Sequence, residues 1–353
     1  MTEQKKICLV IPSLHAGGME RVMSELANYF AQKPGLEIHL VCLIKGKIFY
    51  SIAESVILHE PDFEKKSWFI YSLMTLIYLR KTLKKINPVA VLSFGETYNS
   101  FVLLSALFLN LKIFVSDRSK PDKSWGKTHE FLRRILYPKA KGIISQTTYS
   151  KTFLQKETNH TNICVIPNPV DAAKFNGQQR RKVILNVGRL ISSKKIEILL
   201  EIFAQTNHGD WNLWIVGDGP LRFQLEEKAA QLGISNAVKF WGSQKDIAGY
   251  YSQSAIFAFT SVSEGFPNAL LEALAAGLPC ISFDCVAGPS DLIQDGVNGF
   301  LIPEMDTETY LSKLQHLMDN VELRNNMGNQ ALETAKEFHI SKIGEDYLKF
   351  ITA

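Results

Sequence analysis

Two glutamates frame a short turn that is suited to binding a sugar nucleotide. Glu264 and Glu272 flank the stretch Gly265-Phe266-Pro267-Asn268, and residues 269–275 are good helix formers. Because proline is tolerated in the first turn of a helix, we expect Glu264 in the loop before a helix and Glu272 roughly a turn and a half inside it. A helix N-terminus attracts phosphate, whereas carboxylates accept hydrogen bonds from sugar and ribose hydroxyls. An exposed loop glutamate and a helix-face glutamate are the simpler interpretation of such a pair taken alone.

Two cations follow an apolar run that has the character of a buried strand. Gly188-Arg189-Leu190 comes directly after residues 183–187, and Lys194 precedes the next helical pattern. Arginine offers a planar fork and lysine a point charge, so together they can neutralise a departing diphosphate. A solvated basic turn is the alternative for these residues alone. Because the sequence has no Asp-x-Asp pair and no Cys/His metal spacing, we expect no metal and no cofactor.

Other glycine-rich turns lie at expected strand ends. Gly17 and Gly18 separate the first expected strand from the first helix, where backbone N–H groups can approach an oxyanion. His15 beside them is a weaker candidate for a substrate contact. The turns at 216–220 and 240–242 could border a nucleotide, although core packing explains the rings of the second turn better. The absence of G-x-G-x-x-G argues against an NAD-dependent enzyme.

Length and composition indicate two globular domains. The chain has 353 residues, of which 46% are hydrophobic and 21% charged. Its five cysteines are scattered through apolar runs and are typical of buried thiols in a reducing compartment. There is neither a signal-peptide pattern nor a long uncharged apolar run, so we expect no transmembrane helix and a cytoplasmic location.

Apolar runs alternate with helical patterns along the whole chain. This alternation predicts an α/β protein with two doubly wound parallel sheets, each covered by helices on both faces. We expect a first domain over residues 1–170, a polar linker at 176–182 and a second domain over 178–337. The expected strands are residues 7–11, 38–43, 89–93, 113–116 and 143–145, then 183–187, 213–216, 238–240, 256–259 and 280–283.

Charge is distributed unequally between the two halves. Residues 1–170 carry 23 Lys and Arg against 13 Asp and Glu, a net charge of +10, whereas residues 171–353 carry 16 against 22, a net charge of −6. Segments 67–86 and 123–141 combine basic residues with Trp68 and Trp125, which favours an anionic membrane surface over nucleic acid as the partner. Helices that pack on the sheet and turn a basic face outward are the alternative.

Taken in order, these motifs resemble those of the family 4 retaining glycosyltransferases of GT-B architecture. The resemblance covers nearly the whole chain. Beyond the motifs above, it rests on residues 166–171 (Ile-Pro-Asn-Pro-Val-Asp), 288–293 (Gly-Pro-Ser-Asp-Leu-Ile) and 295–299 (Asp-Gly-Val-Asn-Gly). Within this family the chain looks most like bacterial enzymes that extend lipid-linked oligosaccharides for surface polysaccharides or glycans.

The resemblance implies an N-terminal acceptor-side domain and a C-terminal donor domain that face a cleft, with a last helix within 338–353 returning to the first domain. It implies that Arg189 and Lys194 hold the donor diphosphate, Glu272 the ribose and Glu264 the transferred sugar. The same resemblance places the backbone of 265–268, together with Gly17 and Gly18, against the donor.

The sequence departs from the family pattern at a few positions. Many members carry a histidine after the strand matched by 113–116. Asp117 and Arg118 stand there in this chain, so Arg118 takes the place of the histidine, and both residues are candidates on the acceptor side. Lys195 replaces the usual glycine or asparagine after the motif lysine, and Asp291 stands where glutamate is frequent.

The predicted function is a retaining transfer of a hexose or N-acetylhexosamine from a UDP-sugar to a membrane lipid-linked saccharide. The predicted location is the inner face of the cell membrane, with peripheral attachment. A nucleotide-sugar epimerase on the same fold is one alternative, and a catalytically silent partner subunit is another. The intact Glu264, Arg189 and Lys194 count against the silent subunit.

Overall fold

The chain forms two compact units. A computed structural model describes residues 4–63, 67–121, 123–175 and 179–353. The first unit comprises residues 1–169 and 340–353, and the second comprises residues 170–339. The expected linker at 176–182 falls inside the second unit, and its residues 176–178 lie outside the described residues.

The first unit alternates strands with helices. Its strands are β1 (Lys5–Ile11), β2 (Leu36–Cys42), β3 (Ile57–His59), β4 (Ala90–Phe94), β5 (Ile113–Ser116), β6 (Gly142–Ser145) and β7 (Ile163–Val165). Its helices are α1 (Gly18–Ala31), α2 (Trp68–Ile86), α3 (Glu96–Ser105), α4 (Lys127–Leu136), α5 (Thr148–Thr158) and α13 (Ile340–Thr352), with a 3-10 turn η1 (Tyr137–Lys139).

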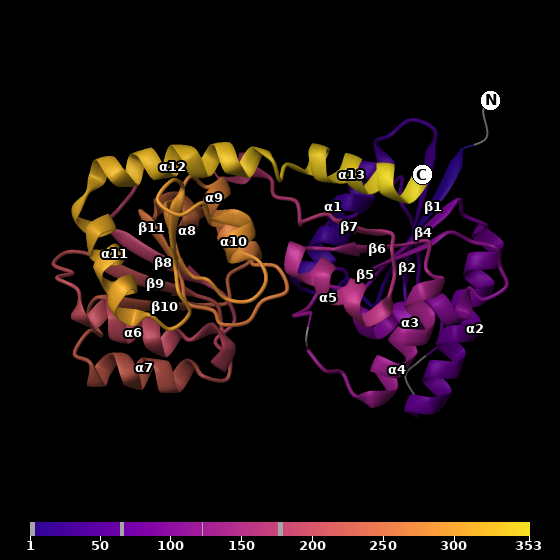
Figure 1. Ribbon diagram of the computed structural model, residues 1–353, viewed down its shortest axis with the longest axis horizontal. Helices are drawn as coiled ribbons and strands as arrows, with labels where there is room; N and C mark the ends of the chain where they lie inside the picture. Colours follow the sequence, from indigo (N-terminus) through magenta and orange to yellow (C-terminus); the bar gives the residue numbers. More distant parts are fainter. Residues whose placement is uncertain (1–3, 64–66, 122, 176–178) are drawn as a thin grey trace. The chain divides into compact units, whose positions relative to one another are not determined.

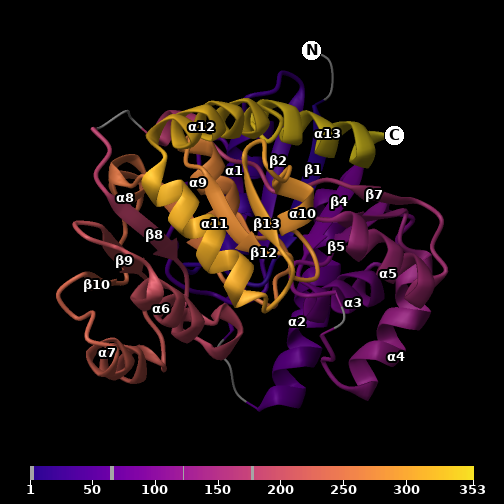
Figure 2. The ribbon, with the colours of Figure 1, turned by 60° about the vertical axis from the view of Figure 1, so that its left-hand side comes forward.

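The strands of the first unit form one parallel sheet with helices on both faces. Its order in the described chain is β3-β2-β1-β4-β5-β6-β7. Side chains of β1 alternate between two cores: Ile7 and Leu9 pack with α1 and α13, whereas Cys8 and Val10 pack with α2 and α3. Figure 2 shows α3, α4 and α5 side by side on one side of this sheet.

The second unit repeats this architecture. Its strands are β8 (Val183–Val187), β9 (Asn212–Val216), β10 (Val238–Gly242), β11 (Ile256–Phe259), β12 (Cys280–Phe283) and β13 (Gly299–Ile302). Its helices are α6 (Ile196–Gln205), α7 (Arg222–Gln231), α8 (Ala248–Gln253), α9 (Asn268–Ala275), α10 (Pro289–Leu292), α11 (Thr307–Asp319) and α12 (Val321–Lys336), with 3-10 turns η2 (Ala172–Lys174) and η3 (Ser192–Lys194).

The strand order of the second unit defines where a ligand is expected to bind. The sheet runs β10-β9-β8-β11-β12-β13 in parallel pairs, between α6 and α7 on one side and α9 and α12 on the other (Figure 1). The chain reverses its winding direction between β8 and β11. In doubly wound sheets ligands bind at the carboxyl ends of the strands beside this switch point, and both cation and glutamate motifs of the second half follow β8 or β11.

The predicted fold class is confirmed, and several elements were not predicted. The sequence reading missed the three-residue strands β3 and β7, the strand β13 and the helices α3, α8, α10, α11 and α12. It also placed Pro267 in the first helical turn, whereas α9 begins one residue later, at Asn268. Very short strands do not produce an apolar run long enough to separate them from a loop.

No helix in the described ranges is long and apolar enough to cross a bilayer. The five cysteines are free thiols, four of them buried and Cys164 half-buried. Burial raises the pKa of Cys42 to about 12, so this thiol stays protonated at neutral pH.

Candidate active site

Lys194 and Glu264 form an ion pair in the second unit. Lys194 ends η3, after β8, and Glu264 lies in the loop between β11 and α9. The Lys194 Nζ donates a hydrogen bond to the Glu264 Oε1, and the two side chains are only 20% and 12% exposed. They lie far apart in the sequence and meet because β8 and β11 are neighbours in the sheet.

Backbone contacts hold this pair in place. The Thr260 Oγ1 donates to the Lys194 carbonyl at 2.9 Å, and the Val262 N–H donates to the Ser193 carbonyl at 2.9 Å. The Lys194 Nζ also lies 5.5 Å from the centre of the Phe259 ring. The turn after β8 and the turn after β11 are therefore joined, which fixes the position of the lysine relative to the glutamate.

Arg189, which precedes Lys194 by a few residues in the sequence, supplies a second cation. Its side chain is exposed, while Leu190 next to it is fully buried and anchors the turn. Within the described part of the chain, the Arg189 guanidinium makes no hydrogen bond or ion pair. Its charge and its donor fork are therefore available to an anion.

Lys195 adopts a backbone conformation that side chains rarely take. Its φ of 51° and ψ of 38° are left-handed, between the end of η3 and the start of α6. Glycine and asparagine adopt this region most easily, which gives a physical reason for the usual residue at this position of the family. The Lys195 side chain forms a partly exposed ion pair with Glu197, at 3.5 Å.

Two glycine turns of the second unit pack against each other. A Cβ on Gly217 would lie 1.9 Å from the Gly188 carbonyl oxygen, and a Cβ on Gly219 would lie 2.4 Å from that of Leu190. The Leu190 N–H donates to the Asp218 carbonyl at 3.0 Å. The glycines at 217 and 219 are thus required for the close approach of two neighbouring turns, whether or not they also meet a nucleotide.

Glu272 is held inside the second unit by a tyrosine. It lies in the second turn of α9, 7% exposed, and its Oε2 accepts a hydrogen bond from the Tyr251 hydroxyl at 2.9 Å. The same hydroxyl also lies 3.2 Å from the Ala269 carbonyl. Tyr251 comes from α8 and is fully buried, so it fixes one carboxylate oxygen of Glu272 on the helix.

The backbone of the turn before α9 offers fewer donors than its sequence suggested. Pro267 has no N–H, and the Asn268 N–H donates to the Phe266 carbonyl at 3.0 Å. The N–H groups of Gly265 and Phe266 donate to no described residue. A Cβ on Gly288 would lie 2.2 Å from Pro267 Cδ, so the turn at the start of α10 packs directly on this proline.

Gly17 and Gly18 lie at the start of α1 in the first unit. Gly17 is the N-cap residue and has extended backbone. A Cβ at Gly17 would lie 2.1 Å from the Glu20 Oε2, so the Glu20 carboxylate already occupies the space at this helix start. Burial raises the pKa of Glu20. A donor anion would meet these glycines only if Glu20 turned away.

His15 nearby is exposed, with its Nδ1 3.1 Å from the Ser13 hydroxyl.

Asp117 lies in a buried polar network of the first unit. It accepts hydrogen bonds from the Tyr137 hydroxyl at 2.5 Å and from the Asn99 amide at 3.1 Å. Burial, and secondarily the charge of Glu96, raises the pKa of Asp117 to about 6.

Arg118 makes structural contacts in the same unit. Its two terminal nitrogens donate to Asn168 Oδ1 at 2.7 Å and to the Tyr347 hydroxyl at 2.6 Å. Its guanidinium also lies 3.4 Å from the centre of the Phe94 ring. Arg118 therefore ties the end of β5 to the motif at 166–171 and to helix α13. An acceptor contact of Asp117 or Arg118 stays a prediction.

Two family profiles match consecutive parts of the chain. "Glycosyltransferase Family 4" matches residues 16–174, and "Glycosyl transferases group 1" matches residues 169–334. The chain is a family 4 glycosyltransferase. Its two parallel sheets are those of the GT-B fold, as in the lipopolysaccharide outer core galactosyltransferase WaaB, which is 23% identical and superposes with a TM-score of 0.79 over 98% of this chain and 99% of that one.

Relatives of this glycosyltransferase include enzymes of glycan assembly. A Campylobacter jejuni protein is 27% identical over 98% of both chains and is named as an α-1,4-N-acetyl-D-galactosaminyltransferase of a diNAcBac-PP-undecaprenol-linked saccharide. The structure of HepE from Anabaena, in complex with UDP and glucose, is 16% identical, with a TM-score of 0.80 over 98% of this chain and 99% of that one.

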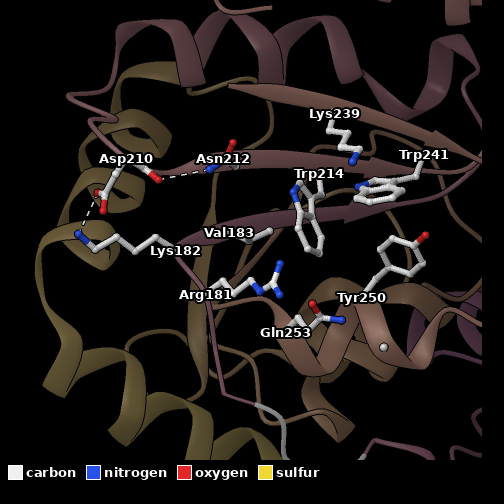
Figure 3. Close-up of a pocket in the computed structure, with 11 residues that line it drawn as sticks. Arg181, Lys182, Val183, Asp210, Asn212, Trp214, Lys239, Trp241, Tyr250 and Gln253 are labelled. Carbon is white, nitrogen blue, oxygen red and sulfur yellow. Dashed lines mark hydrogen bonds and ion pairs between the residues drawn. The ribbon is translucent and has the colours of Figure 1, made fainter. Parts of the chain in front are cut away.

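One cavity of the glycosyltransferase is lined by neither Lys194 nor Glu264. It measures about 780 Å³ and is bordered by Val183 and Asn212, the first residues of β8 and β9. Figure 3 shows Trp214, Trp241 and Tyr250 gathered on one side of it and the Lys182–Asp210 ion pair on the other. Trp241 packs edge to face on the rings of Trp214 and Tyr250. This agrees with core packing as the explanation for the aromatic rings of the turn at 240–242. Ligands of doubly wound sheets bind at the opposite edge.

Two residues of the glycosyltransferase's site were missed by sequence reasoning. Tyr251 orients Glu272, and Thr260 holds the backbone of Lys194. Neither belongs to a motif, and their roles arise only when α8 and β11 are brought next to the motif residues. In the described ranges, no three His, Cys, Asp or Glu side chains gather as a metal site would need; independence from metal stays a prediction.

Proposed function

We propose that this glycosyltransferase moves a hexose or N-acetylhexosamine from a UDP-sugar to a membrane lipid-linked saccharide, with retention at the anomeric carbon and without a metal ion. The observation that carries this proposal is the placement of Arg189, Lys194 and Glu264 at the carboxyl ends of β8 and β11. The UDP and glucose bound by HepE and the lipid-linked acceptor in the name of the Campylobacter enzyme support the choice of donor and acceptor.

The Lys194–Glu264 pair has a direct role in this proposal. When a donor binds, the Nζ of Lys194 moves to a diphosphate oxygen, and the Glu264 carboxylate is released to accept a hydrogen bond from a hydroxyl of the sugar. Arg189 adds a second cation on the diphosphate. With both cations on the diphosphate, the charge that develops on the leaving group is stabilised. Glu272, oriented by Tyr251, accepts from the ribose.

Retention then follows from attack on the same face. The acceptor hydroxyl oxygen bonds to the anomeric carbon while the bond from that carbon to the phosphate oxygen breaks. The hydroxyl proton passes to the departing diphosphate oxygen, which lies beside the incoming group. No protein nucleophile is needed, and UDP leaves with the bonding electrons of the broken bond.

The first unit has the surface expected of a membrane-docking domain. Helix α2 exposes an apolar stripe on its outer face, and α4 exposes a second one. The stripe residues are Phe69, Ile70, Leu73 and Ile77 on α2, and Phe131 and Ile135 on α4. A helix that only packed on the sheet would turn polar residues outward. The side chain of Trp68 lies outside the described residues, and Trp125 is 40% exposed. These stripes and the +10 charge of residues 1–170 support peripheral association with the cytoplasmic face of an anionic membrane.

One experiment tests the proposed reaction. The purified protein is incubated with a panel of UDP-sugars, with and without an undecaprenyl-diphosphate-linked oligosaccharide in detergent. We expect a lengthened saccharide with the donor's anomeric configuration, detected by mass spectrometry and NMR, and UDP release that requires the acceptor. Release of free sugar or of an epimer without acceptor would indicate the epimerase instead, and no turnover of any donor would indicate the silent subunit.

A further inference from the structure

An apolar pocket lies inside the first unit, at the carboxyl edge of its sheet. It measures about 510 Å³. Leu43 and Ile44, which follow β2, and the first turn of α3, which follows β4, form one end of it. The carboxyl edge of a doubly wound sheet is where ligands bind. Further lining residues come from α2, from α3 and from the segment leading into α4: Tyr71, Thr75, Tyr98, Phe101, Trp125 and His129.

Two of the polar side chains that line the pocket hydrogen-bond within the protein. The Tyr71 hydroxyl donates to the Leu43 carbonyl at 3.0 Å, and the Thr75 hydroxyl donates to the Tyr71 carbonyl at 2.8 Å. His129 is different: its Nε2 is buried and has no hydrogen-bond partner among the described residues. A buried polar nitrogen of this kind is normally satisfied by a water molecule or by a ligand atom.

The surroundings of the pocket match a lipid that carries an anionic head. Helix α2, which forms one wall, turns its apolar stripe outward on the opposite side of the same helix. Lys45 and Lys47, next to the lining residue Ile44, are exposed, and the Lys123 Nζ lies 3.8 Å from the centre of the Trp125 ring. Cations close in the sequence to residues that line an apolar pocket favour a ligand that joins a hydrocarbon chain to phosphate.

We propose that this pocket binds the isoprenoid segment next to the diphosphate of the lipid-linked acceptor, with His129 Nε2 meeting an oxygen of the head group. This inference rests on the proposed function, because it takes a polyprenyl diphosphate as the carrier. A bilayer surface alone needs only the exposed stripes, whereas an apolar pocket with an unpartnered imidazole nitrogen among the described residues suits a lipid with a polar head. The volume lies within the range of pockets that enclose most of a small ligand.

The test fills the pocket and compares two acceptors. Thr97, at the start of α3, lines the cavity and is only half-buried, so Thr97→Phe places a ring inside it without removing a core side chain. Thr97→Val is the matched control for the loss of the hydroxyl. Trp125→Ala is a second variant that removes a wall, and Leu104→Ala on the exposed side of α3 controls for the loss of apolar surface. The KM is measured in detergent for an acceptor with a long polyprenyl chain and for the same saccharide diphosphate on a short alkyl group.

We expect Thr97→Phe and Trp125→Ala to raise the KM for the polyprenyl acceptor by roughly tenfold to a hundredfold, as the loss of a buried apolar group of isoprene size implies. The KM for the short acceptor, the kcat and the affinity for UDP should stay the same. An equal change for both acceptors, or no change for either, overturns the proposal.

Binding of polyprenyl phosphate, followed by tryptophan fluorescence in detergent, separates this inference from the proposed function. Binding to the wild type that is lost in Thr97→Phe supports the pocket even if no sugar is transferred. Absence of polyprenyl phosphate binding to the wild type overturns the pocket even if transfer occurs. If Thr97→Phe instead weakens sedimentation with vesicles that lack polyprenol, the pocket serves bilayer lipid and the proposal is wrong.

Discussion

Replacing Glu264 with glutamine separates the two roles assigned to the glutamates of this site. Glutamine keeps the shape of the side chain and one carbonyl acceptor but removes the charge that faces Lys194. Because Lys194 is then no longer held by Glu264, its Nζ stays available to the diphosphate. Glu264→Gln should therefore bind UDP as well as the wild type or better, while turnover falls.

The magnitude follows from the burial of the pair. Exposed ion pairs contribute about 0–1 kcal/mol, and breaking a fully buried one costs about 3–5 kcal/mol. The Lys194 and Glu264 side chains are 20% and 12% exposed, so their coupling should lie between these limits, at about 1–3 kcal/mol. The loss of a contact made in the transition state lowers turnover by about 10²–10³, or roughly 3–4 kcal/mol.

Two measurements check this prediction. A double-mutant cycle with Glu264→Gln and Lys194→Met, followed by chemical denaturation, gives the coupling energy of the pair. Lys195 and Glu197 provide the control cycle, because they form a neighbouring pair that is 32% and 37% exposed and should couple by less than about 1 kcal/mol. Calorimetry with UDP, together with turnover, is then compared for Glu264→Gln and Glu272→Gln. Glu272→Gln should weaken UDP binding by about tenfold, as expected for one hydrogen bond to a charged group.

The reasoning fails in two ways. If Glu264→Gln abolishes UDP binding and Glu272→Gln leaves it intact, the assignment of sugar and ribose contacts is reversed. If the coupling between residues 194 and 264 is no larger than that of the control pair, the ion pair does not hold the site together.

Four other expectations concern the metal, the backbone, pH and the membrane. Excess EDTA should leave turnover unchanged; complete loss that magnesium or manganese restores would show that the diphosphate needs a metal. Lys195→Gly should raise the free energy of unfolding by about 0.5–1 kcal/mol, because it relieves a left-handed backbone; lower stability in urea denaturation would contradict this. Since the folded pKa of Asp117 is raised to about 6, the stability that this one group contributes should be lost as pH rises from about 4 to 6. Unfolding of Asp117→Asn should depend less on pH in that window, and an unchanged slope would refute it. The protein should sediment with anionic liposomes at low salt and less at high salt. If replacement of Lys81, Lys84 and Lys85 by Gln raises the KM for the acceptor but leaves sedimentation with liposomes unchanged, these lysines bind the acceptor instead of the membrane.

The basic end of α2 shows why a charge cluster cannot be interpreted from sequence alone. Judged from sequence alone, the four cations at residues 80–85 suit either membrane docking or the binding of an acceptor diphosphate. In the structure, Arg80 donates to the carbonyls of Ser105 and Leu107 at 2.8 Å each, so its guanidinium supports the end of α3. The cluster also lies just before β4, at the amino edge of the sheet, whereas the pocket lies at the carboxyl edge. Docking is therefore the better explanation for its lysines.

Local pattern was sufficient to predict most of the fold. Apolar runs such as 113–116, 183–187 and 256–259 have the bounds of real strands, because a strand covered on both faces must be apolar throughout. The helix that begins beside Pro267, and the turns after β8 and β11, were likewise predictable from helix formers and glycines. Short strands such as β3 and β7 were not predictable from local pattern. They are strands because they pair with β2 and β6, more than because of their own residue types.

The sequence by itself determined the residue types that a diphosphate-sugar site needs, the two sheets and the family. Only the tertiary structure decided which of these residues meet. Lys194 reaches Glu264 because β8 and β11 are neighbours, Tyr251 reaches Glu272 because α8 packs on α9, and Arg118 is tied to Tyr347 because α13 returns to the first unit. The physical reason is that periodicity depends on neighbours along the chain, whereas strand order and helix packing join residues dozens to hundreds of positions apart.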